Sequence, residues 1–251
     1  FAALVVVGFG VGIAFITNPL ASFGSGVDVI RLDTYRVYFD FFGPHTIIVL
    51  ADLFAVFWIV WVINMVNFSA GVNGQMPGIV LIALFVLFAS TLRFGGSDPT
   101  QTVVARLAII GAGATLAFLI YNFPRAKIFP GDSGSYFLGF LVAVISILSG
   151  AKVGTAILVM AVPLIDGVFT IIRRVGTGRF PFTAARGHLQ HKLLNLGWKQ
   201  WQIALFYWSL CAILGALALS LSSTGKLFAG IIFAVAILGG LLWLNTNLPL
   251  K

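Results

Sequence analysis

Long apolar segments separated by short polar loops restrict the folds that are open to this chain. Eight such segments lie near residues 1–16, 46–66, 78–92, 103–121, 135–150, 153–172, 201–222 and 227–245. A segment that crosses a bilayer must be a helix of about 20 mostly apolar residues, because hydrocarbon offers no hydrogen bonds to the backbone. The sequence therefore predicts an all-α, polytopic transmembrane helical bundle with about eight crossings.

The composition excludes a water-soluble globular domain. Hydrophobic residues make up 60% of the 251 residues, charged residues only 9%, and all seven acidic residues are Asp. Too few charged side chains remain to cover the surface of a soluble protein of this length. We interpret residues 1–251 as a single integral membrane domain. Its one Cys, Cys211, lies in a predicted crossing and supports neither a disulfide framework nor a thiolate metal site.

The distribution of Lys and Arg predicts which loops face the cytoplasm, because basic loops are retained there. The loops at 67–77, 122–134 and 173–200 and the tail from 246 carry nine of these residues. The alternate loops carry five, together with four of the seven Asp, and the loop at 17–45 among them is expected to be an interfacial cap without a site. The first set is therefore assigned to the cytoplasm. No nucleic-acid partner is expected, because the basic residues are divided among helix ends.

Three polar, glycine-rich segments on this predicted cytoplasmic face, 64–77, 122–135 and 173–200, are the candidate active-site loops. Asp132 stands in the sequence GDSGS, where glycines permit close approach of the backbone to phosphate. Its carboxylate could hold Mg²⁺ against a diphosphate; the alternative is that Asp132 only caps the following helix. Lys127 is either a point charge for phosphate or a lysine that snorkels at a helix end.

The third segment carries two histidines among basic residues. His188 and His191, spaced i and i+3, lie beside Arg186 and Lys192, so both imidazoles fall on one side of a helical turn. The loop has no Cys or carboxylate to complete a zinc site, which favours a cationic phosphate cradle. The alternative is a solvated amphipathic helix with incidental histidines.

Other polar residues are less specific. Asn64, Asn67 and Asn73 could donate hydrogen bonds to a base or a sugar amide, or could simply end a helix. Asp166 is an acid inside a predicted crossing and thus a functional suspect, although a structural ion pair with Arg173 or Arg174 is the preferred interpretation.

Taken together, these segments resemble the polyprenyl-phosphate N-acetylhexosamine-1-phosphate transferases across nearly the whole chain. NFPRAKIFPGDSGS, and PLIDGVFTIIRR followed by GRFPFTAARGHLQHKLLNLG, are similar to the bacterial branch that starts cell-wall and surface polysaccharides. NMVNFSAGVNG is similar to the eukaryotic dolichyl-phosphate GlcNAc-1-phosphate transferases. The resemblance implies transfer of an N-acetylhexosamine-1-phosphate, with GlcNAc favoured, from a UDP-sugar to a polyprenyl phosphate such as undecaprenyl phosphate. UMP would be released at the cytoplasmic face of a bacterial-type inner membrane, and the enzyme would be a homodimer.

The resemblance also implies roles for single residues. The Asp that matches Asp132 binds Mg²⁺, with Mn²⁺ as an alternative ion. The residues that match the family's catalytic group, which stabilises phosphate charge, are Lys127, His188 and His191. Those that match its substrate-binding group are Asn67, Asn73, Asn122 and Arg186.

Three departures from the family pattern qualify these roles. The family's acidic motif and two of its ten helices precede the segment with which this chain begins, so we expect residues 1–251 alone to be inactive. Ala185 replaces the usual Asp before Arg-Gly-His, and Gln190 stands where bacterial relatives carry His, which predicts an altered sugar or lipid preference. A catalytically inactive scaffold and a polytopic transporter are the alternative functions.

Overall fold

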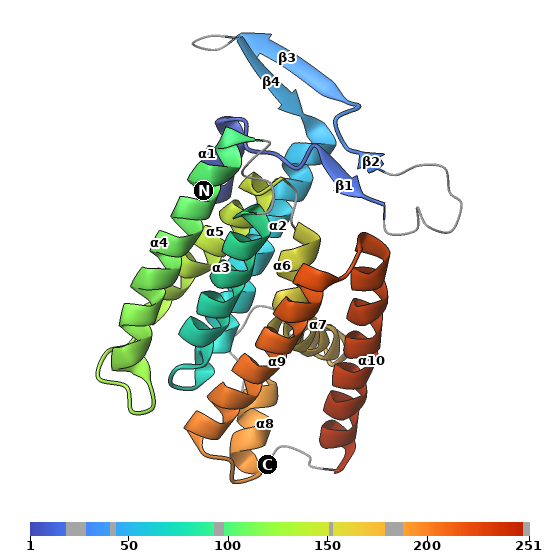
Figure 1. Cartoon of the computed structure of the whole chain (residues 1–251). Helices are drawn as coiled ribbons and strands as arrows, with labels where there is room; N and C mark the ends of the chain where they lie inside the picture. The colour runs from blue at the N-terminus through green and yellow to red at the C-terminus, as the bar shows by residue number, and fades with distance from the viewer. Residues whose placement is uncertain (19–28, 41–43, 93–97, 151–152, 179–187, 248–251) are drawn as a thin grey trace.

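Six long apolar helices form the body of the protein in a computed structural model (Figure 1). The structure describes residues 1–18, 29–40, 44–92, 98–150, 153–178 and 188–247. Within these ranges, the six helices long and apolar enough to cross a membrane are α2 (Val49–Phe68), α3 (Gln75–Leu92), α4 (Pro99–Asn122), α5 (Gly131–Leu148), α9 (Gln200–Ser220) and α10 (Ser223–Asn247). They correspond to six of the eight predicted crossings and confirm a polytopic helical bundle.

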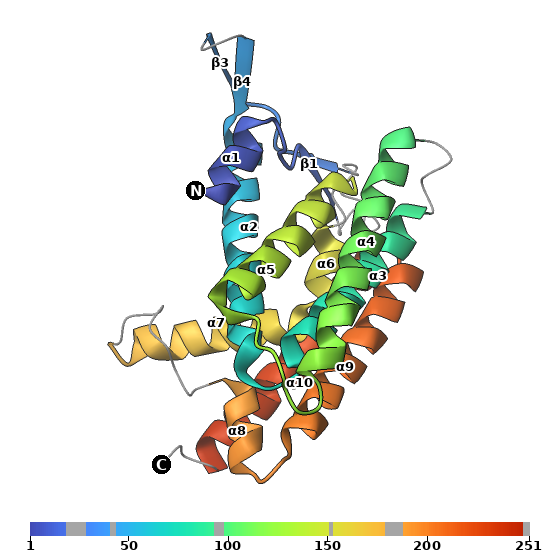
Figure 2. The same ribbon diagram turned by 90° about the vertical axis from the view of Figure 1, so that its left-hand side faces the viewer.

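The predicted crossing at 153–172 is broken into two helices. α6 (Val153–Val159) and α7 (Ala161–Gly176) meet at an angle of 79° and make a seventh span only if they are taken as one. Figure 2 shows α7 running sideways out of the bundle. Pro163 accounts for the break, because it has no N–H to donate to the Val159 carbonyl and its ring would clash with that group in a continuous helix.

The first predicted crossing, 1–16, is not one span among the described residues. It contains the short helix α1 (Ala2–Gly8) and the strand β1 (Phe15–Thr17), which pairs antiparallel with β2 (Val29–Arg31). A second hairpin follows, with β3 (Arg36–Asp40) paired to β4 (Pro44–Ile48) so that Arg36 lies opposite Ile48. The expected all-α fold therefore carries two small hairpins, where short runs of β-branched and aromatic residues satisfy their backbone groups by pairing.

The core of the bundle lies around α3. This helix packs against α4, α9, α5 and α6. Of its membrane-spanning segment 67% is buried inside the protein, compared with 6% of the corresponding segment of α10. α2 packs chiefly on α5, where Gly139 permits a backbone approach: a Cβ at Gly139 would lie 2.7 Å from Ile63 Cα. This close approach positions the ends of α2 and α5 beside each other.

The short helices at the other end of the bundle complete the framework of the site. The 3-10 turn η2 (Ser69–Gly71) follows α2, and α8 (Leu189–Asn195) lies between α7 and α9. Figure 1 shows α8, the turn after α2 and the connection from α4 to α5 at the end of the bundle opposite the hairpins. The described parts of all three predicted active-site loops are therefore on one face.

Candidate active site

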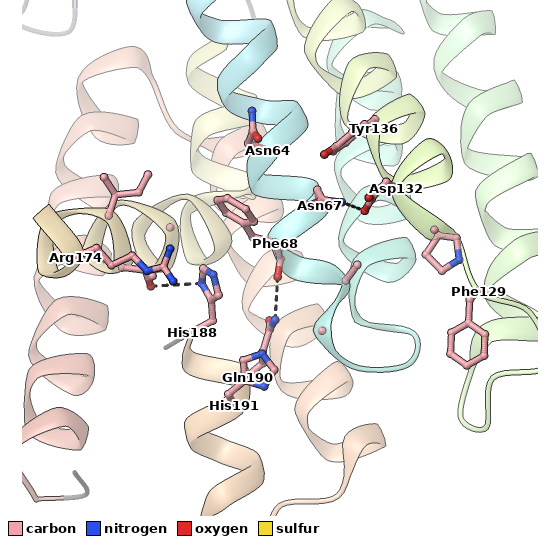
Figure 3. Close-up of a pocket in the computed structure, with 17 residues that line it drawn as sticks. Asn64, Asn67, Phe68, Phe129, Asp132, Tyr136, Arg174, His188, Gln190 and His191 are labelled. Carbon is pink, nitrogen blue, oxygen red and sulfur yellow. Dashed lines mark hydrogen bonds between the residues drawn. The ribbon is translucent and has the colours of Figure 1, made fainter. Parts of the chain in front are cut away.

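A cavity of about 690 Å³ opens where these three loops meet. Figure 3 shows Asp132 and Tyr136 on one side of it and Arg174, His188 and His191 on the other. Its walls come from the end of α2 and η2, the start of α5, one face of α7, and the start of α8: Asn64, Asn67, Phe68, Ala70, Gly71, Phe129, Pro130, Gly131, Asp132, Tyr136, Gly167, Thr170, Ile171, Arg174, His188, Gln190 and His191. The convergence predicted from charge and glycine content is thus present in the fold.

Asp132 lies in the first turn of α5 and faces the cavity. Asn67, at the end of α2, donates from Nδ2 to Asp132 Oδ1 at 3.1 Å (Figure 3). It also donates to Ser135 Oγ at 2.8 Å. The N-cap of α5 is Pro130, and no side chain caps the helix, so the alternative in which Asp132 serves only as a cap is wrong. An exposed carboxylate held by a neutral amide keeps its charge available to a ligand in the cavity.

The donor set fits one kind of metal site. Among the described residues no group of three His, Cys, Asp or Glu could enclose an ion, and Asp132 is the acidic residue in the cavity wall. Mg²⁺ is usually held by one or two carboxylates together with water and substrate phosphates, and seldom by a cage of protein ligands. A single carboxylate at the edge of an open, polar cavity fits a Mg²⁺ ion shared with a phosphate ligand.

The imidazole of His188 is hydrogen-bonded to the buried carboxylate of Asp166. Its Nδ1 lies 2.9 Å from Asp166 Oδ2, and the other oxygen of Asp166 accepts the backbone N–H of Leu189 at 2.8 Å. Asp166 therefore pairs with His188 and not with Arg173 or Arg174, and the expected ion pair is wrong. The arginines follow Asp166 by two helical turns on α7, whereas the histidine comes to it from α8.

Gln190 joins the first and third loops beneath the cavity. Its Nε2 donates to the Phe68 carbonyl at 2.8 Å, and its Oε1 accepts from Gln75 Nε2 at 2.7 Å. Gln190 is 2% exposed and Gln75 is fully buried. A residue noted in the sequence as a departure from the family pattern thus makes two hydrogen bonds that locate α8 relative to the end of α2 and the start of α3.

Lys192 follows His191 in α8. Its side chain is buried, with Nζ 3.4 Å from the Leu241 carbonyl and 5.3 Å above the centre of the Phe169 ring. Burial lowers the pKa of the Lys192 ammonium, Arg173 lowers it further, and Asp166 opposes the change. Lys192 therefore packs behind the cavity wall and is not among the residues that line the cavity.

Several predicted site residues do not line the cavity. Lys127 is exposed on the loop after α4, and Asn73 offers its backbone N–H to Gln200 Oε1 at 3.4 Å. Asn122 is buried, accepts the Gly74 N–H at 2.7 Å and donates to the Ile128 carbonyl at 2.8 Å. In this structure Asn122 ties two loops together. Arg186 and Ala185 lie outside the described residues.

The cavity also contains residues to which sequence reasoning assigned no role in the site. Arg174 was predicted only as a basic residue at a helix end and a possible ion-pair partner of Asp166, and no local pattern singled out Tyr136 or Phe129. Asp166 was noted as an acid inside an apolar segment, which was the available signal, but its partner is 22 residues away in the sequence. No local pattern identifies a partner at that separation.

Comparison with known proteins places the chain in a family. A family model described as "Glycosyl transferase family 4" matches residues 2–150, which is more than half of the chain and includes the first two active-site loops. The chain belongs to glycosyl transferase family 4. The matched region ends before α7 and α8.

Individual relatives of this glycosyl transferase family 4 chain act on polyprenyl phosphates, according to their names. The chain is 34% identical over 149 residues to the probable undecaprenyl-phosphate N-acetylglucosaminyl 1-phosphate transferase of Bacillus subtilis, an alignment that covers 57% of this chain and 40% of the relative. It is 35% identical over 164 residues to the decaprenyl-phosphate N-acetylglucosaminephosphotransferase of Mycobacterium tuberculosis, covering 57% and 41%.

A third relative, the phospho-N-acetylmuramoyl-pentapeptide-transferase of Staphylococcus carnosus, is 31% identical over 171 residues, covering 66% of this chain and 50% of the relative. The chain thus spans between two fifths and half of the length of these curated relatives.

Proposed function

We propose that this protein transfers an N-acetylhexosamine-1-phosphate, GlcNAc-1-phosphate in the first instance, from a UDP-sugar to a polyprenyl phosphate and releases UMP. The observation that carries the proposal is the charge arrangement of the cavity, with one carboxylate facing an arginine and two histidines. Phosphoryl transfer requires positioning and neutralisation of charge more than covalent chemistry. The names of the relatives support the same reaction class.

Asp132 would hold Mg²⁺, or Mn²⁺ in its place, at the cavity edge. A bound ion supplies neutralisation of the diphosphate charge. Asn67 orients the carboxylate through its 3.1 Å hydrogen bond and keeps it directed into the cavity. Arg174, His188 and His191 face it from the opposite wall and would contact the phosphate oxygens.

A second, largely apolar groove of about 550 Å³ supports a lipid acceptor. It is lined by α6, the start of α7, α10 and the residues around β1, and includes Phe54, Leu164, Ile165 and Ile231. Ile165 and Gly167 are two positions apart on α7, and the first lines the groove while the second lines the polar cavity. The bent helix would therefore separate the acceptor's isoprenoid chain from its phosphate while holding both.

The loop after α2 supports GlcNAc as the sugar. Ala70 lines the cavity within the stretch NMVNFSAGVNG, which resembles the dolichyl-phosphate GlcNAc-1-phosphate transferases. We further propose that this end of the bundle faces the cytoplasm of an inner membrane, on the basis of its positive charge, and that the protein is a homodimer.

The direct test is UMP release from UDP-GlcNAc with undecaprenyl phosphate and Mg²⁺, measured on the full-length gene product in detergent. Asp132→Asn is expected to abolish release, whereas Asp98→Asn, the same change at the N-cap of α4, is expected to leave it unchanged because Asn caps helices as well as Asp. Lipid-dependent release that is lost only in Asp132→Asn supports the proposal. No release with any UDP-N-acetylhexosamine would overturn it in favour of a scaffold or transporter.

A further inference from the structure

The buried carboxylate of Asp166 accepts two hydrogen bonds from adjacent residues of another element. Its Oδ2 is 2.9 Å from His188 Nδ1, and its Oδ1 is 2.8 Å from the backbone N of Leu189. The side chains of His188 and Asp166 are only 9% and 6% exposed. Asp166 thus holds both the imidazole and the backbone at the start of α8 from a position on α7.

This contact determines which nitrogen of His188 carries a proton. An ionised carboxylate can only accept, so the ring nitrogen beside it must be the donor, and Nδ1 is protonated in both the neutral and the cationic ring. Thr170 Oγ lies 3.4 Å from the same Nδ1, and the Phe68 ring packs against the imidazole with centroids 5.3 Å apart. Because His188 lines the cavity, Nε2 is the ring nitrogen left to meet a ligand there.

We propose that Asp166 is a positioning residue that holds His188 in the Nδ1–H form, so that its bare Nε2 can shuttle a proton during phosphoryl transfer. The inference rests on the proposed function and assigns a further role within the same site. A carboxylate bound to Nδ1 fixes both the orientation and the tautomer of the ring, which leaves Nε2 directed at the cavity.

The step is balanced as follows. Nε2 takes the proton of an acceptor phosphate monoanion, whose pKa is near 6. The resulting dianion oxygen attacks the sugar-bearing phosphorus, a new P–O bond forms, and the bridging P–O bond breaks with its electron pair leaving on UMP. The imidazolium then returns its proton to the UMP phosphate, and His188 is restored without any co-reactant.

Asp166→Asn removes this arrangement with almost no change in size. Asn has one acceptor oxygen where Asp has two, so it cannot accept from both Leu189 N–H and His188 Nδ1–H. The backbone N–H is always a donor, whereas the imidazole can change its tautomer. The Asn oxygen is therefore expected to bind Leu189 and its amide nitrogen to face Nδ1, which moves the imidazole proton to Nε2.

The first measurement is ¹⁵N NMR of the full-length protein labelled at histidine, with the His188 signals assigned by their loss in His188→Gln. A protonated Nδ1 in the wild type, and a bare Nδ1 with a protonated Nε2 in Asp166→Asn, support the proposal. A bare Nδ1 in the wild-type protein would overturn it, whether or not the variant folds. This readout needs no turnover, so it stands if the proposed reaction is wrong.

The second measurement is steady-state UMP release by Asp166→Asn beside Asp98→Asn. We expect kcat of Asp166→Asn to fall about 10- to 100-fold, with KM for UDP-GlcNAc within about twofold of wild type, because an orienting partner acts on the reacting group more than on binding. Unchanged kcat in a folded Asp166→Asn would refute the positioning role. An inactive wild type would instead refute the proposed function and leave the tautomer to the NMR result.

Discussion

Gly139 is the contact on which the geometry of the site depends, and Gly139→Ala tests that dependence. A Cβ atom there would lie 2.7 Å from Ile63 Cα on α2 and 3.2 Å from the Val66 side chain. Ordinary contact begins at 3.4 Å, so α5 and α2 must separate by about 0.7 Å. The nearest atom belongs to the backbone and cannot rotate away.

The expected magnitude combines two opposing effects. Overpacking a close helix contact costs about 1 to 3 kcal/mol, and replacing a helical Gly by Ala recovers about 0.5 to 1 kcal/mol. The net loss of roughly 1 to 2 kcal/mol corresponds to a fall in Tm of about 2 to 8 °C for a chain of this size.

The same displacement acts on the site. Asn67 follows Ile63 by one helical turn, and Asp132 precedes Gly139 by two. Their hydrogen bond of 3.1 Å would lengthen beyond bonding distance if the helices moved apart by about 0.7 Å. UMP release is therefore expected to fall about 10- to 100-fold, in line with the effect of displacements of this size on catalytic groups.

Thermal unfolding in detergent can be followed with a fluorogenic maleimide that reports exposure of the buried Cys211. The matched control is Gly113→Ala on α4, where an added Cβ meets no atom within 4 Å. It should keep wild-type activity and an equal or slightly higher Tm. If Gly139→Ala behaves like this control in both assays, the close approach of α5 to α2 does not position the site and the reasoning fails.

Three further changes test the packing around the cavity. Asn122→Ala removes both hydrogen bonds that tie its neighbouring loops, and we expect a loss of about 1 to 3 kcal/mol in thermal unfolding; an unchanged Tm would contradict the tie. Gln190→Leu should cost a similar amount, and a double-mutant cycle with Gln75→Leu should show coupling; additive effects would count against the network. Lys192→Met should raise Tm near neutral pH, because burial and then Arg173 lower the pKa of Lys192 in the folded state. The folded protein loses that proton before the unfolded chain does, so wild-type stability should rise and the difference shrink as the pH increases toward about 10; a constant difference would refute this.

Composition, hydropathy and short motifs were enough to predict a membrane environment, a helical bundle and several residues of the site. Apolar segments of membrane-spanning length can only be helices, so six crossings were predictable from local composition. Asp132, His188 and His191 stand in short motifs whose chemistry is visible in neighbouring residues, and all three line the cavity. Charge and glycine content alone also indicated that their loops lie on one face.

Which side chains meet could not be predicted and follows from the packing of the helices. Asn67 and Asp132 are 65 residues apart, and Asp166 and His188 are 22 apart, so no local periodicity encodes either contact. The physical reason is that hydrophobicity and secondary-structure propensity depend on residues close together in the sequence. Hydrogen bonds between helices depend on how closely those helices pack. At Gly139 the close packing of α5 on α2 depends on the absence of a single methyl group.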